Sequence, residues 1–135
     1  MNWFRKSQVQ RFPSTGVLEY KGDNRCVLNI SPDLCRYYKS LIPKSQSVQP
    51  QMFPCHITVV RTGKEEPLNR EAWGRYEGEV VPFEYENAVS RGSVYYTLNA
   101  WSERLEEIRE ELGLPRTRTG YDEFHITIGN TKNVM

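Results

Sequence analysis

Short runs of apolar residues separated by turn-forming residues dominate the chain and indicate a protein rich in strands. In six segments the residues are alternately apolar and polar, or β-branched and aromatic, as in half-buried strands. These predicted strands are residues 17–20, 25–30, 55–61, 79–86, 93–98 and 124–129. Pro82 predicts that the strand at 79–86 lies at an edge or carries a bulge, because proline cannot donate a ladder hydrogen bond.

Two segments carry helix signals, and a short helical turn is expected at residues 69–73. Ser31, Pro32 and Asp33 supply an N-cap, a proline at the first helical position and an acid in the first turn, so a helix should run to Leu41. A second helix is predicted because apolar residues recur at spacings of four, three and four, followed by a glycine stop. These apolar residues are Trp101, Leu105, Ile108 and Leu112, and the stop is Gly113.

These elements predict an α+β fold with antiparallel sheet, because helices do not alternate regularly with strands. The length of 135 residues fits one domain, which we expect over residues 16–135 after an irregular N-terminal leader at 1–15. No apolar run is long enough to span a bilayer, and no signal-peptide pattern is present, so a cytoplasmic location without membrane contact is expected.

The charge distribution indicates which class of ligand to expect, and the cysteine content indicates whether disulfides or a zinc site are expected. Residues 1–48 hold eight Lys/Arg against three Asp/Glu, whereas residues 64–111 hold six against twelve, and the net charge is only +1. A chain that tracks a long nucleic acid usually has a larger basic excess, so a small anion is the expected ligand. The three cysteines fit neither a disulfide framework nor a zinc pattern and are expected to be reduced, buried apolar residues.

The most informative feature is a repeated tripeptide that holds both histidines of the chain. His56-Ile57-Thr58 and His125-Ile126-Thr127 each lie within a predicted strand with apolar flanks. Residues i and i+2 of a strand point to the same face, so each histidine shares a face with its threonine. The two copies therefore form a weak internal repeat, which we expect in equivalent places of two half-structures.

Two imidazoles and two hydroxyls converging on one cleft suit phosphodiester cleavage. One histidine can accept the proton of an attacking hydroxyl and the other can protonate the leaving oxygen, while the sequence leaves open which does which. The threonines can donate hydrogen bonds to the non-bridging phosphate oxygens. No metal ligand set is evident, and no cofactor is expected. Two structural strands with surface histidines remain the alternative interpretation.

With these motifs on strands, the chain resembles the 2H phosphoesterase superfamily, and specifically its bacteriophage branch. The resemblance extends over residues 16–132 through several further segments. These are Leu34–Tyr38 with Leu41–Lys44, HITVVR at 56–61, WGRYEG at 73–78, LNAWS at 98–102, LGLP at 112–115 and HITIGNTK at 125–132.

This resemblance implies a two-lobed, LigT-like fold whose antiparallel sheets line a central cleft, with helices packed outside. It implies His56, Thr58, His125 and Thr127 as the catalytic set of a metal-independent nuclease. The substrates implied are the cyclic di- and trinucleotide signals of bacterial CBASS antiphage immunity, met in the host cytoplasm. Some members of this branch extend past the second motif to close over the ligand. Only eight residues follow Thr127 here, which suggests looser capture, a shared partner subunit or another substrate.

Four further residues are candidates for substrate binding, because a nucleotide needs stacking surfaces and cations. They are Tyr20, Lys44, Arg61 and Tyr121, with Tyr95 and Tyr96 as additional aromatic candidates. Two other functions stay open: processing of RNA ends or 2′,3′-cyclic phosphates within the same superfamily, and a protein that sequesters a nucleotide without cutting it. The oligomeric state is not indicated by the sequence.

Overall fold

The computed structural model describes residues 10–51, 53–118 and 120–132, and its architecture is a closed antiparallel barrel. Seven strands form one sheet in the order β4-β1-β2-β3-β7-β6-β5, and an additional β4–β6 pairing joins the two sides. The strands are β1 (Arg11–Lys21), β2 (Arg25–Asn29), β3 (His56–Val60), β4 (Val80–Glu86), β5 (Ser90–Arg91), β6 (Tyr95–Trp101) and β7 (Phe124–Asn130).

This closure contradicts the expected two-lobed α+β fold of the 2H phosphoesterases. The protein is mostly β, and six strands form a single closed ring rather than two sheets facing each other across a cleft. The ring closes because β4 pairs with β1 along residues 11–17 and then with β6 at Glu84 and Tyr85. Closure removes the exposed edges that two separate sheets would leave.

Strand β1 explains why the sequence pattern did not predict the ring. It begins at Arg11, so residues 11–15 belong to the sheet and not to the expected irregular leader, whose residues 1–9 lie outside the described part. Pro13 and Gly16 interrupt the apolar alternation of this segment. Gly16 is required by packing, since a Cβ there would lie 2.6 Å from the carbonyl oxygen of Asn29. The residues that close the ring thus lack a strand-like pattern.

Both predicted helices are present, although Trp101, which was expected on the apolar face of the second helix, is the last residue of β6. Helix α1 (Pro32–Ser40) begins after Ser31, whose hydroxyl accepts a hydrogen bond from the Asp33 amide, and α2 (Glu103–Glu111) is capped by Ser102 in the same way. The described part of the chain has two 3-10 turns, η2 (Lys44–Gln46) and η3 (Arg70–Ala72), and the second was expected. Among the described residues, no helix is long and apolar enough to cross a membrane.

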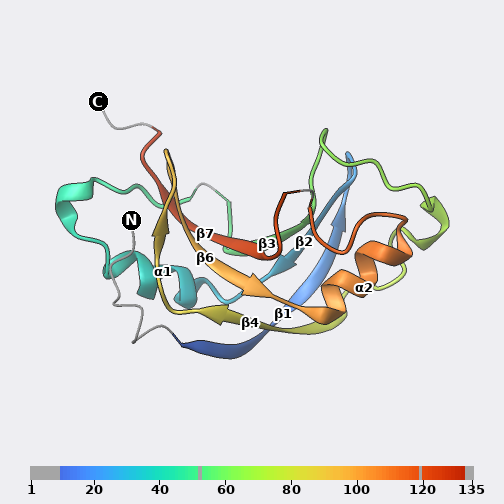
Figure 1. The fold of residues 1–135 in the computed structure, drawn as a ribbon, viewed down its shortest axis with the longest axis horizontal. Coiled ribbons are helices and arrows are strands. Elements are labelled where there is room, and N and C mark those ends of the chain that lie inside the picture. The colour runs from blue at the N-terminus through green and yellow to red at the C-terminus, as the bar shows by residue number, and fades with distance from the viewer. Residues whose placement is uncertain (1–9, 52, 119, 133–135) are drawn as a thin grey trace.

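The barrel consists of two topologically equivalent halves. In each, a strand, a helix and a motif strand follow one another: β2, α1 and β3, then β6, α2 and β7. The helices lie at opposite ends of the molecule, and each packs against the motif strand of the other half, α1 on β7 and α2 on β3 (Figure 1). The expectation that the two motifs occupy equivalent places in two half-structures is thereby confirmed.

Two of the three cysteines depart from expectation. Cys35 of α1 and Cys55 form a disulfide, whereas Cys26 is a free, buried thiol as expected. The prediction of reduced cysteines rested on their odd number and wide spacing, and neither property reports which pair the fold brings together. The disulfide fixes α1 to the residue that precedes His56 and so braces the start of β3.

Candidate active site

The two motif strands are neighbours in the ring, and their register brings the His-x-Thr motifs together. Ile57 of β3 pairs with Ile126 of β7 in antiparallel orientation. In such a ladder the flanking positions also oppose each other, with Cβ atoms about 4.5–5.5 Å apart. Each histidine therefore lies across from the threonine of the other motif: His56 from Thr127, and His125 from Thr58.

The alternation of the two strands separates a core face from a site face. Ile57 and Ile126 are fully buried, whereas the histidines and threonines beside them are half-buried. The strands on either side of the two motif strands are also arranged symmetrically. Asn29 of β2 pairs with His56, and Asn99 of β6 pairs with His125. The site is thus built about an approximate twofold axis between β3 and β7.

All four motif residues line one cleft with a volume of about 610 Å³. Four arginines and two glutamates also line it, so the charged residues of the cleft are mainly basic. These are Arg25, Arg61, Arg109, Arg118, Glu65 and Glu123. A cleft of this size accommodates a ligand of a few hundred daltons or part of a larger one.

His56 has a defined tautomer. Its Nδ1 lies 2.6 Å from the carbonyl oxygen of Pro54. A carbonyl can only accept, so Nδ1 carries the proton and Nε2 of the neutral ring bears a lone pair. Burial lowers the pKa of His56 below the ordinary histidine value, and the charges of Arg25 and Lys21 lower it further, against the raising effect of the Pro54 carbonyl. The ring is therefore suited to accept a proton at Nε2.

His125 has a different environment because an acid lies beside it. Its Nε2 is 3.5 Å from a carboxylate oxygen of Glu123. Burial lowers the pKa of His125, the Glu123 carboxylate raises it, and the positive charge of Arg118 lowers it, with a net decrease. Glu123 favours the protonated ring, so His125 is the better placed of the two histidines to carry and donate a proton.

Exposed aromatic rings, each accompanied by a cation, surround the motif residues. Phe53 and Tyr121 are 53% and 42% exposed, and both line the cleft. The guanidinium carbon of Arg25 lies 5.1 Å from the Phe53 ring centroid, and that of Arg118 lies 3.9 Å from the Tyr121 ring. The Tyr121 ring also meets His125 edge-on at 5.3 Å. These rings can stack on planar groups, and their arginines can meet phosphates.

Of the four predicted substrate-binding residues, the structure places two in the cleft and two outside it. Arg61 and Tyr121 line the cleft, as does Tyr95. Tyr20 lies outside the cleft lining, packed edge-on against Trp73, and burial raises its pKa to about 12. Lys44 also lies outside, exposed at the start of η2.

Tyr96 is fully buried in β6, and its hydroxyl donates a hydrogen bond to Gln46. The neighbouring Tyr95 lines the cleft, as adjacent strand residues point to opposite faces.

A buried ion pair forms part of the cleft wall. Arg109 of α2 is 1% exposed and makes two hydrogen bonds to the Glu65 carboxylate, at 3.0 and 2.6 Å. It also donates to the carbonyls of Val59 and Pro115. Although burial opposes ionisation, the contacts with Arg109 hold the pKa of Glu65 below its usual range. The pair joins α2, the end of β3 and the segment that leads to Tyr121.

Some site residues could have been found from the sequence and others could not. Glu123 stands two residues before His125, so the same strand alternation that joins His125 to Thr127 places it near their face. Arg25 likewise shares a face with Asn29 in β2. Phe53 and Glu65 lie in connecting segments, where no periodicity predicts the direction of a side chain.

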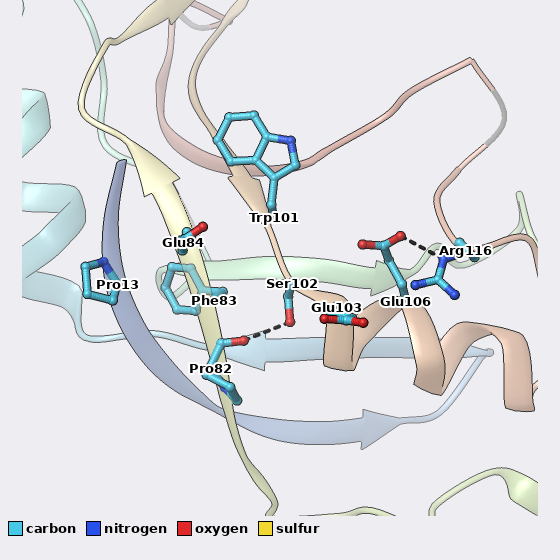
Figure 2. Close-up of a pocket in the computed structure, with 9 residues that line it drawn as sticks. All are labelled: Pro13, Pro82, Phe83, Glu84, Trp101, Ser102, Glu103, Glu106 and Arg116. Carbon is cyan, nitrogen blue, oxygen red and sulfur yellow. Dashed lines mark hydrogen bonds and ion pairs between the residues drawn. The ribbon is translucent and has the colours of Figure 1, made fainter. Parts of the chain in front are cut away.

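A second, shallower hollow surrounds the start of α2 and explains how the Tyr121 segment is held (Figure 2). There the Ser102 hydroxyl donates to the Pro82 carbonyl at 2.8 Å, which fixes α2 to β4. Arg116 bonds to Glu106 at 3.0 Å and to Glu110 at 2.7 Å. These contacts tie the segment before Tyr121 to α2, so we assign this hollow a structural role.

The donor set at the cleft is one of acid–base and hydrogen-bonding groups. Within residues 10–51, 53–118 and 120–132, no three His, Cys, Asp or Glu side chains are grouped so that they could hold a metal ion.

Comparison with family models, with curated proteins and with solved structures finds no match to this chain. A functional assignment therefore depends on the chemistry of the cleft itself.

Proposed function

We propose that the protein is a metal-independent phosphodiesterase that opens small cyclic oligonucleotides. The observation that carries this proposal is the β3–β7 register, which sets each histidine opposite the other motif's threonine across a shared cleft. Two acid–base groups and two hydroxyl donors around one point match the needs of phosphodiester cleavage.

The reaction begins with a ribose 2′-hydroxyl of the substrate. His56 Nε2 accepts the proton of that hydroxyl, whose oxygen attacks the adjacent phosphorus. The bond from phosphorus to the 5′-oxygen then breaks, and His125 donates its proton to that oxygen. The products of this step are a 2′,3′-cyclic phosphate and a free 5′-hydroxyl, so no water is consumed. Thr58 and Thr127 donate hydrogen bonds to the non-bridging oxygens, where negative charge builds up.

The roles of the two histidines follow from their partners. Pro54 holds the proton on Nδ1 of His56, which leaves Nε2 as an acceptor. Glu123 lies 3.5 Å from Nε2 of His125 and favours its protonated form. We therefore assign His56 as the general base and His125 as the general acid.

A nucleotide is favoured as substrate because exposed aromatic rings and arginines flank the motif residues. Phe53 and Tyr121 offer stacking surfaces for bases, and Arg25 and Arg118 accompany them. The sequence resemblance to the bacteriophage branch adds the cyclic signals of CBASS immunity as the substrate class, within the host bacterial cytoplasm. That resemblance is now supported by the matching sequence segments alone, because the two-lobed fold that it implied is wrong.

The test is chromatography of the products formed from a panel of cyclic di- and trinucleotides in the presence of a chelator. We expect cleavage by the wild-type chain, a loss of about 10²-fold or more in His56→Ala and His125→Ala, and little change in the exposed control Thr15→Ala. Cyclic substrates without the 2′-hydroxyl should resist cleavage.

Two further measurements distinguish the proposed function from RNA-end processing and from nucleotide sequestration. Faster turnover of RNA that ends in a 2′,3′-cyclic phosphate would identify an RNA-end enzyme. Intact ligand recovered from stoichiometric protein would identify a sequestering protein. Full activity in both histidine variants would refute the proposal.

A further inference from the structure

A side pocket of about 300 Å³ adjoins the active-site cleft. Arg25, Phe53 and His56 line both hollows, so these side chains form a common wall between them. The remaining polar lining of the side pocket includes Lys21 of β1 and Asn29 of β2. None of these groups is used by the cleavage step except His56, so the side pocket is available for another part of the ligand.

Two cations stand directly opposite each other at this pocket. Lys21 and Arg25 are register partners at the end of the β1–β2 hairpin. The hairpin turns through Asp23 and Asn24, which both have positive φ, at 58° and 59°. Like charges directly opposite on paired strands are destabilising. Such a pair does not stabilise the fold, but both of its cations can bind the same anion.

The nearby carboxylate compensates this repulsion only in part. Glu19 lies 3.5 Å from Lys21 Nζ and accepts a hydrogen bond from the Asn29 amide at 2.9 Å. One carboxylate thus faces two cations, and the pocket keeps a net positive charge. Besides the Glu19 carboxylate and the Asn29 amide that donates to it, the polar lining holds an ammonium and a guanidinium, which are donors suited to phosphate oxygens.

We propose that the side pocket binds a second phosphate of the substrate, adjacent to the one being cleaved, through Lys21 and Arg25. This inference rests on the proposed function and narrows its substrate to an oligonucleotide with more than one phosphate. With the scissile phosphate at the two histidines, the chain of the ligand passes the wall at Phe53, and its next phosphate meets the cations beyond. Lys21 and Arg25 also act electrostatically on the His56 ring, which agrees with their closeness to it.

The proposal is tested by binding to the full chain carrying His125→Ala, so that the ligand is not consumed. Lys21→Gln removes one charge from the side pocket without touching the cleft lining. Lys39→Gln removes the same charge from the last turn of α1, outside both hollows, and is the matched control. The ligands are a cyclic trinucleotide, with three phosphates, and the dinucleoside monophosphate ApA, with one.

We expect Lys21→Gln to raise the Kd of the cyclic trinucleotide about tenfold and Lys39→Gln to leave it unchanged. The slope of log Kd against log salt should fall by about one in the Lys21 variant only. For ApA, the two variants should give the same Kd. Thermal unfolding should show that Lys21→Gln is no less stable than the control, because a repulsion is relieved.

The proposal is overturned if the cyclic trinucleotide does not bind, or if Lys21→Gln leaves its Kd unchanged. It is also overturned if Lys39→Gln weakens binding equally, or if ApA loses as much affinity as the trinucleotide in Lys21→Gln. Failure of the proposed function is a separate result, since it appears as intact ligand with the wild-type chain or as full cleavage activity in the His56→Ala and His125→Ala chains, whatever the affinities are.

Discussion

Ile57 of β3 is paired with Ile126 of β7, and this single pairing sets the two His-x-Thr motifs opposite each other. Both isoleucines are fully buried, so the register is held by core packing. A shift of either strand by one residue would turn that strand's histidine into the core. The relative placement of the two histidines and two threonines therefore depends on the apolar middle residue of each His-x-Thr motif.

The assignment of base and acid predicts selective rescue by a better leaving group. In a substrate whose bridging 5′-oxygen is replaced by sulfur, the leaving thiolate needs no proton. We expect His125→Ala to cleave this substrate at close to the wild-type rate, whereas His56→Ala stays impaired by about 10²-fold or more. Rates on the oxygen and sulfur substrates are compared by chromatography. Rescue of His56→Ala instead would reverse the two roles.

The pKa shifts of the histidines predict an acidic pH optimum. The base must be deprotonated, so activity rises as the pH rises through the pKa of His56, and it falls as the pH rises through the pKa of His125. Both values are lowered, so the alkaline limb should lie below the ordinary histidine value of about 6.5.

The same reasoning predicts the effect of Glu123→Gln, which removes a group that raises the pKa of His125. The alkaline limb should then move to lower pH while the acidic limb stays in place. The measurement is the pH dependence of kcat/KM for both chains, since this profile reports the groups of the free enzyme. A shift of the acidic limb alone would contradict the assignment of His125 as the acid.

The exposed aromatic rings predict a loss of substrate affinity upon truncation. Phe53→Ala and Tyr121→Ala should each raise KM for a cyclic trinucleotide about tenfold or more, with a smaller change in kcat, because a stacked base is lost. Tyr37→Ala is the control, since Tyr37 is 58% exposed on α1 and does not line the cleft. Equal effects of all three substitutions would argue against stacking.

The buried ion pair predicts a large difference between two neighbouring glutamates. Glu65→Gln leaves the Arg109 guanidinium buried without its carboxylate and should lower the free energy of unfolding by about 3–5 kcal/mol. Glu66→Gln alters an exposed pair with Arg70 and should change it by less than about 1 kcal/mol. Urea denaturation measures both. A similar loss in the two variants would show that Arg109 does not depend on Glu65.

The local pattern of the sequence was sufficient for both helices, for most of the strands and for placing each histidine on the same face as its threonine. Strand alternation places His125 and Thr127 on one face whatever the partner strand is, and Ser31 begins α1 where it was predicted. Such features depend on residues a few positions apart, and local chain geometry fixes them.

Only the tertiary structure decided which strands pair and which loop residues reach the site. The β1–β4 pairing that closes the ring involves Pro13 and Gly16, which carry no strand signal, so a two-lobed fold was predicted in its place. Phe53 reaches the cleft from a connecting segment, and Cys35 meets Cys55 across 20 residues. Pairing between distant segments depends on how all the elements pack together, and no periodicity along the chain records it.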